Sequence, residues 1–114
     1  MLERMNQRAA AAAPDVADLS DLGRFLVALG DPIRQGIVVA LSRERLNVGE
    51  LAARFPLSRP AMSHHLKVLA DAGLLVRERQ GRERVYRLDV KRCRSAVGRL
   101  RKFVLDCCAG SACC

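Results

Sequence analysis

Residues 58–73 read SRPAMSHHLKVLADAG, and this stretch decides the fold. Ser58 is a favourable N-cap, a proline is tolerated in the first helical turn, and Gly73 can end the helix in the left-handed conformation. One face of the predicted helix carries Met62, Leu66 and Leu69, and the other carries Arg59, Ser63, His64 and Lys67. A short helix with small polar and cationic side chains near its N-terminus is typical of a recognition helix.

Three more helices are predicted upstream, over residues 20–29, 32–42 and 47–55. Ser20 and Asp31 are suitable N-caps for the first two helices. Asn47, with Glu50 three residues later, predicts a capping box for the third. The tight turn at residues 54–57 then leads into the recognition helix, so the pattern indicates a helix-turn-helix.

Two strands are predicted downstream, over residues 74–79 and 82–88, on either side of Gln80-Gly81. Apolar and basic residues alternate in the second strand, so the hairpin has a basic tip that can lie against phosphate. The predicted fold class is therefore mainly α with a two-stranded β wing, a winged helix-turn-helix.

The chain has 114 residues and a formal net charge of +8. Eleven basic and three acidic residues lie between Arg77 and Lys102, so this segment alone accounts for the whole excess. Such a local excess favours a polyanionic partner, although a solvated surface that only keeps the chain in solution is the alternative.

The sequence resembles the ArsR/SmtB repressors of bacteria over about residues 18–105. The matching segments are ALGDPIR at 28–34, VGELA at 48–52, MSHHLKVL at 62–69, AGL at 72–74 and YRL at 86–88. The resemblance implies a homodimer on an imperfect palindrome of double-stranded operator DNA, with the fourth helix in the major groove and the wing over the backbone. It also implies repression that an inducer relieves.

The candidate DNA-binding residues follow from this arrangement. Arg59, Ser63, His64 and Lys67 are predicted to contact the major groove, and Arg77, Arg79, Arg82 and Arg84 are predicted to hold phosphates.

The last helix carries a narrow apolar seam, spaced alternately by three and four residues. Its members are Val90, Cys93, Val97, Leu100, Val104 and Cys107. The spacing predicts dimerisation through the terminal helices, with packing onto the chain's own first helix as the alternative. A two-fold dimer would place two recognition helices about 34 Å apart.

The C-terminal cysteines Cys107, Cys108, Cys113 and Cys114 are the candidate inducer site. Gly110 between the pairs allows the chain to fold three thiolates onto one centre, and all-sulfur sites select soft ions. Some arsenite-responsive members of the family carry a cysteine pair and a third cysteine here, and the sequence resembles them. We expect trivalent arsenic, methylarsenite or a related soft metal or metalloid such as antimonite, with either Cys113 or Cys114 as the third ligand.

Two inducer sites that the family often uses are absent from this sequence. The Cys-Val-Cys pattern of the third helix is replaced by Asn47-Val48-Gly49, and the only histidines are His64 and His65. A zinc site across the terminal helices is therefore disfavoured, and His64 and His65 are expected to contact DNA, with His65 partly packed.

The expected organisation is a flexible arm at 1–17, a DNA-binding and dimerisation domain at 18–106 and a Cys-rich tail at 107–114. No acid or base accompanies the cysteines, so the chain is not expected to be an enzyme or to use an organic cofactor. No apolar stretch is long enough to span a membrane, and the cysteine distribution favours a cytoplasmic protein. The alternatives are a repressor that responds to thiol oxidation or persulfide, and a thiol-based metal buffer.

Overall fold

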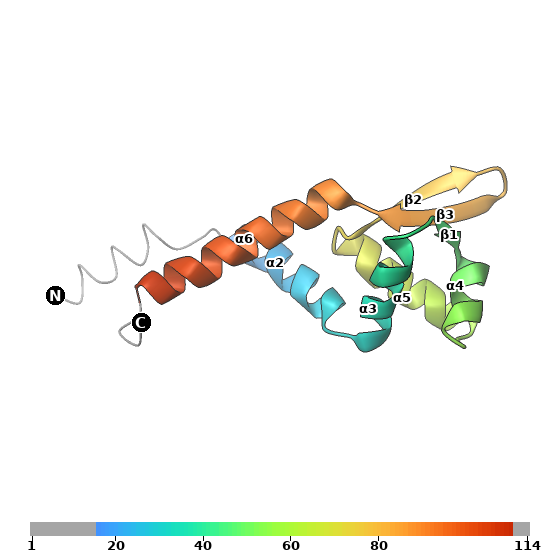
Figure 1. The fold of residues 1–114 in the computed structure, drawn as a ribbon, viewed down its shortest axis with the longest axis horizontal. Coiled ribbons are helices and arrows are strands. Elements are labelled where there is room, and N and C mark those ends of the chain that lie inside the picture. Colours follow the sequence, from blue (N-terminus) through green and yellow to red (C-terminus); the bar gives the residue numbers. More distant parts are fainter. Residues whose placement is uncertain (1–15, 111–114) are drawn as a thin grey trace.

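The computed structural model describes residues 16–110, with side chains from Leu19 onward. Figure 1 shows a helical body from which a β hairpin and a long terminal helix extend in different directions. The elements in chain order are α2 (Val16–Leu29), α3 (Pro32–Leu41), β1 (Leu46–Asn47), α4 (Val48–Arg54), α5 (Arg59–Asp71), β2 (Leu75–Gln80), β3 (Glu83–Leu88) and α6 (Val90–Ala109). The predicted mainly α fold with a β wing is confirmed.

Short polar side chains cap the N-termini of four of these helices, and Asp89 does so for α6 by accepting from the backbone N–H of Arg92. Asp31 accepts hydrogen bonds from the backbone N–H groups of Ile33 and Arg34, at 2.8 and 3.1 Å. The bond from Arg34 is the main reason that the pKa of Asp31 lies below its ordinary value. Asn47 forms the predicted capping box with Glu50, and the predicted cap of α5 also forms. The starts of α3, α4 and α5 were thus predicted correctly from local sequence.

The start of the first helix was predicted wrongly. α2 begins at Val16, so Ser20 lies within the helix and is not its N-cap. Serine is a favourable N-cap, but the helix does not start at Ser20, because α2 runs without interruption from Val16 to Leu29. Helix boundaries of this kind depend on the neighbouring turns as well as on the cap residue.

The wing is part of a three-stranded antiparallel sheet with the order β1-β3-β2. The hairpin pairs Leu75 with Leu88 at its base and Gln80 with Glu83 near its tip. The sequence analysis did not predict β1, a strand of two residues that pairs with Tyr86 and Val85 of β3. This short strand connects the hairpin to the start of α4, so the wing is anchored to the helical body.

The core forms where the inner face of α5 meets α2, α3, α4 and the base of the sheet. Met62, Leu66 and Leu69 of α5 are fully buried, as predicted from their spacing. Gly73 follows α5 with φ +88°, so the predicted left-handed glycine is confirmed. It allows Leu74 and Leu75 to enter the core directly after the helix.

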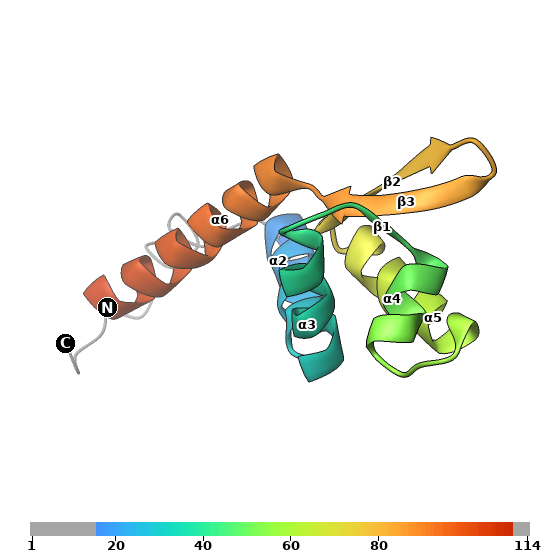
Figure 2. The same cartoon turned by 45° about the vertical axis from the view of Figure 1, so that its right-hand side comes forward.

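α6 packs against the body through its first half and then leaves it. Ala96 is buried and Cys93 contacts the core, whereas every residue from Arg101 to Gly110 is exposed. Figures 1 and 2 show the second half of α6 extending beyond the other helices. Within the described chain, no helix is both long and apolar enough to cross a membrane.

We expect Leu66→Ala to lower the free energy of unfolding by about 2–5 kcal/mol, because a cavity replaces a fully buried side chain of α5. Urea unfolding followed by circular dichroism measures the change. Lys67→Ala is the matched control, since the neighbouring side chain is exposed and its removal should change stability by less than about 0.5 kcal/mol. Equal destabilisation of the two variants would contradict the packing described above.

Candidate nucleic-acid interface and thiol site

The four predicted groove-contacting side chains lie together on the outward face of α5. Arg59, Ser63, His64 and Lys67 are all exposed. Their position follows from the burial of the opposite face, because residues three and four apart share one side of a helix. Among the described side chains, neither Arg59 nor Lys67 takes part in an ion pair. Both cations are therefore available to an anionic partner.

Arg59 lies close to the first turn of α4. A Cβ atom on Gly49 would come within 2.8 Å of Nη2 of Arg59, nearer than real Cβ atoms approach their neighbours. A side chain at position 49 would therefore displace the guanidinium group. From the sequence, Gly49 was noted only as a position where related proteins often carry a cysteine. Glycine lowers the stability of a helix, so a glycine within a helical turn often marks a place where another group lies close to the backbone. This signal was present in the sequence at Gly49.

One face of the wing is occupied by internal ion pairs. Glu78 accepts a hydrogen bond from Nε of Arg87 at 2.6 Å and lies 3.2 Å from Nη1 of Arg45. The hydrogen bond from Arg87 is the main cause of a lowered pKa for the Glu78 carboxyl group. The charge of Arg87 is thus neutralised within the protein.

The other face of the wing carries arginines. Arg79 stands directly opposite Arg84, and Arg77 lies two residues before Arg79 on the same side of β2. Arg82 lies in the turn between the strands. These predicted phosphate-binding side chains are all exposed, and none makes an ion pair with a described side chain. Because like charges opposed across a hairpin repel, an external anion would relieve the repulsion.

The two histidines have different surroundings. His64 is exposed, whereas His65 is half-buried with Nδ1 3.3 Å from Nη1 of Arg34. The Arg34 guanidinium also donates to the backbone carbonyls of Ala28 and Val27, at 2.8 and 3.3 Å. His65 therefore connects α5, through Arg34 of α3, to the last turn of α2, a link that was not predicted from the sequence. Its partly packed position agrees with the prediction.

Cys107 and Cys108 are free, exposed thiols near the C-terminal end of α6. Gly110, the C-cap, has a right-handed backbone with φ −86°. Cys113 and Cys114, the other predicted ligands, lie outside the described residues. Within residues 16–110, no three side chains of His, Cys, Asp or Glu group together as a metal site. The described part of the chain thus presents two of the four predicted thiols.

Cys93 faces the core of its own chain. Its Sγ donates to the carbonyl oxygen of Leu74 at 3.7 Å, and burial, followed by the charge of Asp89, raises the thiol pKa. From its spacing in the sequence, Cys93 was predicted to pack in the seam between subunits. Cys93 instead lies on the side of α6 that faces Leu74. Val90 before it and Val97 after it are exposed apolar residues of the same helix.

Known proteins with similar sequences are helix-turn-helix transcriptional regulators. A family model described as a helix-turn-helix domain matches residues 29–78. The regulator Rv2034 of Mycobacterium tuberculosis is 52% identical over 62 residues, which are 54% of this chain and 58% of that protein. The regulator CmtR of Mycobacterium bovis is 40% identical over 86 residues, covering 75% of this chain and 73% of CmtR. The chain spans less than two thirds of the length of the first curated relatives that it matches.

Solved structures agree with the fold. An ArsR-like transcriptional regulator from Rhodococcus sp. RHA1 is 30% identical with a TM-score of 0.72, over 80% of this chain and 86% of that chain. A possible transcriptional regulator for arsenical resistance is 38% identical with a TM-score of 0.60, over 72% of this chain and 81% of that chain. These proteins are transcriptional regulators rather than enzymes, as expected from the sequence. The chain belongs to the ArsR/SmtB family of winged helix-turn-helix repressors.

Proposed function

We propose that this chain is a homodimeric repressor that releases operator DNA when trivalent arsenic, or a related soft metalloid, binds its C-terminal cysteines. The observation that carries the proposal is the separation of charge on the surface. Among the described residues, cations that make no ion pair line the outward face of α5 and one face of the wing, whereas Arg87 and Arg45 both pair with the single carboxylate of Glu78. Unpaired cations at these two places suit the groove and backbone contacts of a winged helix.

Exposed apolar residues support a dimer through α6 and α2. Val97 and Val104 of α6 are 54% and 46% exposed, and Leu26 and Val27 of α2 are also exposed. Exposed apolar residues on a helix that is otherwise rich in Arg, widened near its end by Phe103 and Leu105, suit a partner helix. A second copy of the chain would cover these residues and bring two recognition helices onto one operator.

The chemistry of the thiols supports a soft inducer. Cys107 and Cys108 are adjacent and exposed, and thiolates prefer soft ions over hard ones. Asp106, which precedes them, pairs with Nζ of Lys102 at 2.6 Å, so part of the nearby negative charge is neutralised. Cys113 or Cys114 would supply the third thiolate. The similarity to a possible regulator for arsenical resistance also favours arsenic.

α6 provides the connection between thiols and DNA. It begins directly after the wing, where the backbone N–H of Asp89 donates to the carbonyl of Leu74 at 2.8 Å, and it continues without a break past Cys108. From Val90 to Cys107 the helix spans about 26 Å. Holding its far end would change how two α6 helices pack and thus how far apart the two α5 helices lie. Ligand and DNA would then weaken each other's binding, typically by about 1–3 kcal/mol.

Gly49→Ala is expected to weaken operator binding without unfolding the protein, because the added methyl group displaces Arg59. Arg59→Ala should weaken binding by about 1–3 kcal/mol, as expected for one side chain that contacts a base. In the double variant, Gly49→Ala should add little to the effect of Arg59→Ala. Fluorescence anisotropy on a labelled operator measures all four proteins. Fully additive effects would show that Gly49 acts on something other than Arg59.

Arg84→Gln and Arg87→Gln each remove one positive charge from the same strand, but they should change different properties of the protein. Arg84→Gln should make the salt dependence of DNA affinity shallower, by about one unit of logarithmic slope for each phosphate that the variant leaves unneutralised. The free energy of unfolding of the Arg84→Gln variant should not fall, because the repulsion between Arg84 and Arg79 is removed. Arg87→Gln should leave the slope unchanged and lower stability, because Glu78 then has no partner on β3. Equal slopes in the two variants would indicate that only net charge matters.

Arsenite should release the operator from the parent protein under reducing conditions, and a Cys107→Ser, Cys108→Ser double variant should remain bound. Cys93→Ser is the matched control and should respond as the parent does, because Cys93 faces the core. Anisotropy of operator from the protein's own promoter measures release. If the double variant also releases DNA, the sensing site lies elsewhere.

The same assay separates the alternatives. Release by peroxide or persulfide, but not by arsenite, would indicate a thiol redox repressor. A parent protein that fails to bind duplex DNA even at low salt would indicate a metal buffer. Methylarsenite, antimonite, mercury and cadmium, tested in the same way, identify the inducer.

A further inference from the structure

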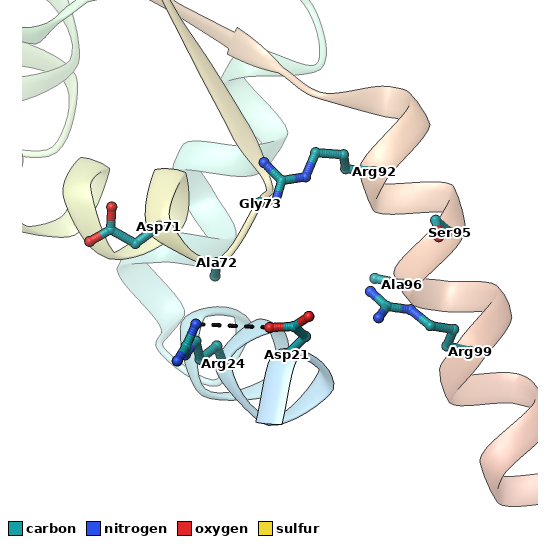
Figure 3. A pocket seen from close by; sticks show the side chains of 9 residues that line it. All are labelled: Asp21, Arg24, Asp71, Ala72, Gly73, Arg92, Ser95, Ala96 and Arg99. Carbon is teal, nitrogen blue, oxygen red and sulfur yellow. Dashed lines mark ion pairs between the residues drawn. The ribbon is translucent and has the colours of Figure 1, made fainter. Parts of the chain in front are cut away.

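The described residues line an open hollow of about 120 Å³ on the surface between α2, the end of α5 and the first half of α6. Figure 3 shows the side chains that line it. α6 contributes a stripe at positions 92, 95, 96 and 99, which are three, four and seven residues apart and therefore share one side of the helix. None of these residues belongs to the DNA-binding or thiol sites described above.

Small residues leave the space open. Ala72, Gly73 and Ala96 line the hollow, and Ala96 is buried where α6 approaches the body. A Cβ atom on Gly73 would lie 3.1 Å from the Nε, Cζ and Nη2 atoms of Arg92, so the guanidinium packs directly over the glycine. The guanidinium group of Arg92 thus occupies space that a side chain at position 73 would need.

Positive charge dominates the rim. The lining includes Arg24, Arg92 and Arg99 together with Asp21 and Asp71, which gives a net charge of one positive unit. Arg24 pairs with Asp21 at 3.8 Å, whereas Arg92 and Arg99 make no ion pair with any side chain that the structure describes. In Figure 3, Asp71 points away from α6, and the guanidinium groups of Arg92 and Arg99 extend from α6 toward α5 and α2. Two unpaired guanidinium groups over a floor of small residues suit a small anion.

The hollow is separate from the proposed DNA-binding face. It adjoins Asp71 at the C-terminal end of α5, about 18 Å along the helix axis from Arg59 at the N-terminal end. DNA phosphates held by Arg59 and the wing would therefore not occupy it.

We propose that this hollow binds a small dianionic oxyanion of about the size of inorganic phosphate, held by Arg92 and Arg99. Guanidinium groups donate two parallel hydrogen bonds to phosphate or carboxylate oxygens, and this geometry favours Arg over Lys. The anion neutralises two exposed cations that share one side of α6. It thereby ties the first half of α6 to α2 and to the end of α5.

The site has a consequence for regulation that rests on the proposed function. α2 and α6 carry the exposed apolar residues of the proposed dimer, so an anion that holds these helices together would influence the angle at which α6 leaves the body. DNA affinity would then depend on the anion as well as on the thiols. Binding of the anion itself does not require DNA or arsenic.

The test is a titration of the full chain, without DNA, with inorganic phosphate and, in parallel, with malonate at constant pH and ionic strength. Two-dimensional NMR of the ¹⁵N-labelled protein should show saturable shifts of the amides of Ala72, Gly73 and Ala96 with at least one of the two anions. Arg92→Gln with Arg99→Gln should weaken that binding at least tenfold. Arg92→Lys with Arg99→Lys should give an intermediate weakening, because charge remains and the paired donors do not.

Arg94→Gln with Arg101→Gln is the matched control, since it removes the same charge from the opposite side of α6 and should leave the titration unchanged. Shifts that fail to saturate with either anion, or equal weakening by the two Gln pairs, would overturn the proposal. The remaining peaks of each spectrum report whether the variant is folded. If the double Gln variant is unfolded, the double Lys variant tests the proposal in its place. Anisotropy with DNA in anion-free buffer tests the repressor function separately.

Discussion

The inner face of α5 is the constraint on which the rest of the structure depends. Met62, Leu66 and Leu69 are completely buried, and the helix cannot rotate without exposing them. Because side chains repeat every 3.6 residues, their burial also determines which residues point outward. Arg59 and Lys67 are presented to solvent for this reason. The core and the proposed recognition surface are thus two sides of one helix, which couples stability to DNA binding.

The sheet divides the charges of the wing in a similar way. Glu78 and Arg87 share one face and neutralise each other, with Arg45 close by. Arg79 and Arg84 share the other face and make no ion pair with any side chain that the structure describes. The positions of the charges on the two faces, rather than the total charge of the segment, therefore determine which arginines can bind an external anion. A shift of the strand register by one residue would exchange the two faces and move the unpaired arginines.

α6 combines roles that compete for its surface. Cys93 and Ala96 bind it to the body, the stripe containing Arg92 and Arg99 borders a hollow, and exposed valines favour a partner helix. The helix then extends to two free thiols. A rigid element that joins the wing, the proposed dimer surface and the thiols provides a physical route by which the proposed sites can influence one another, because a helix transmits displacement along its axis.

The sequence by itself determined the elements that depend on near neighbours. Capping by Asn47 and Ser58, the apolar spacing of α5 and the left-handed Gly73 were all predicted correctly, since each depends on residues within one or two turns. The outward position of the side chains predicted to contact DNA from α5 and the wing followed from the same periodicity.

Only the tertiary structure decided the contacts between distant residues. These include the pairing of β1 with β3, the approach of Arg59 to Gly49, the packing of Cys93 on Leu74 and the choice of Arg87 as the partner of Glu78. The physical reason is that helix crossing and strand register, which no local pattern specifies, bring these atoms together.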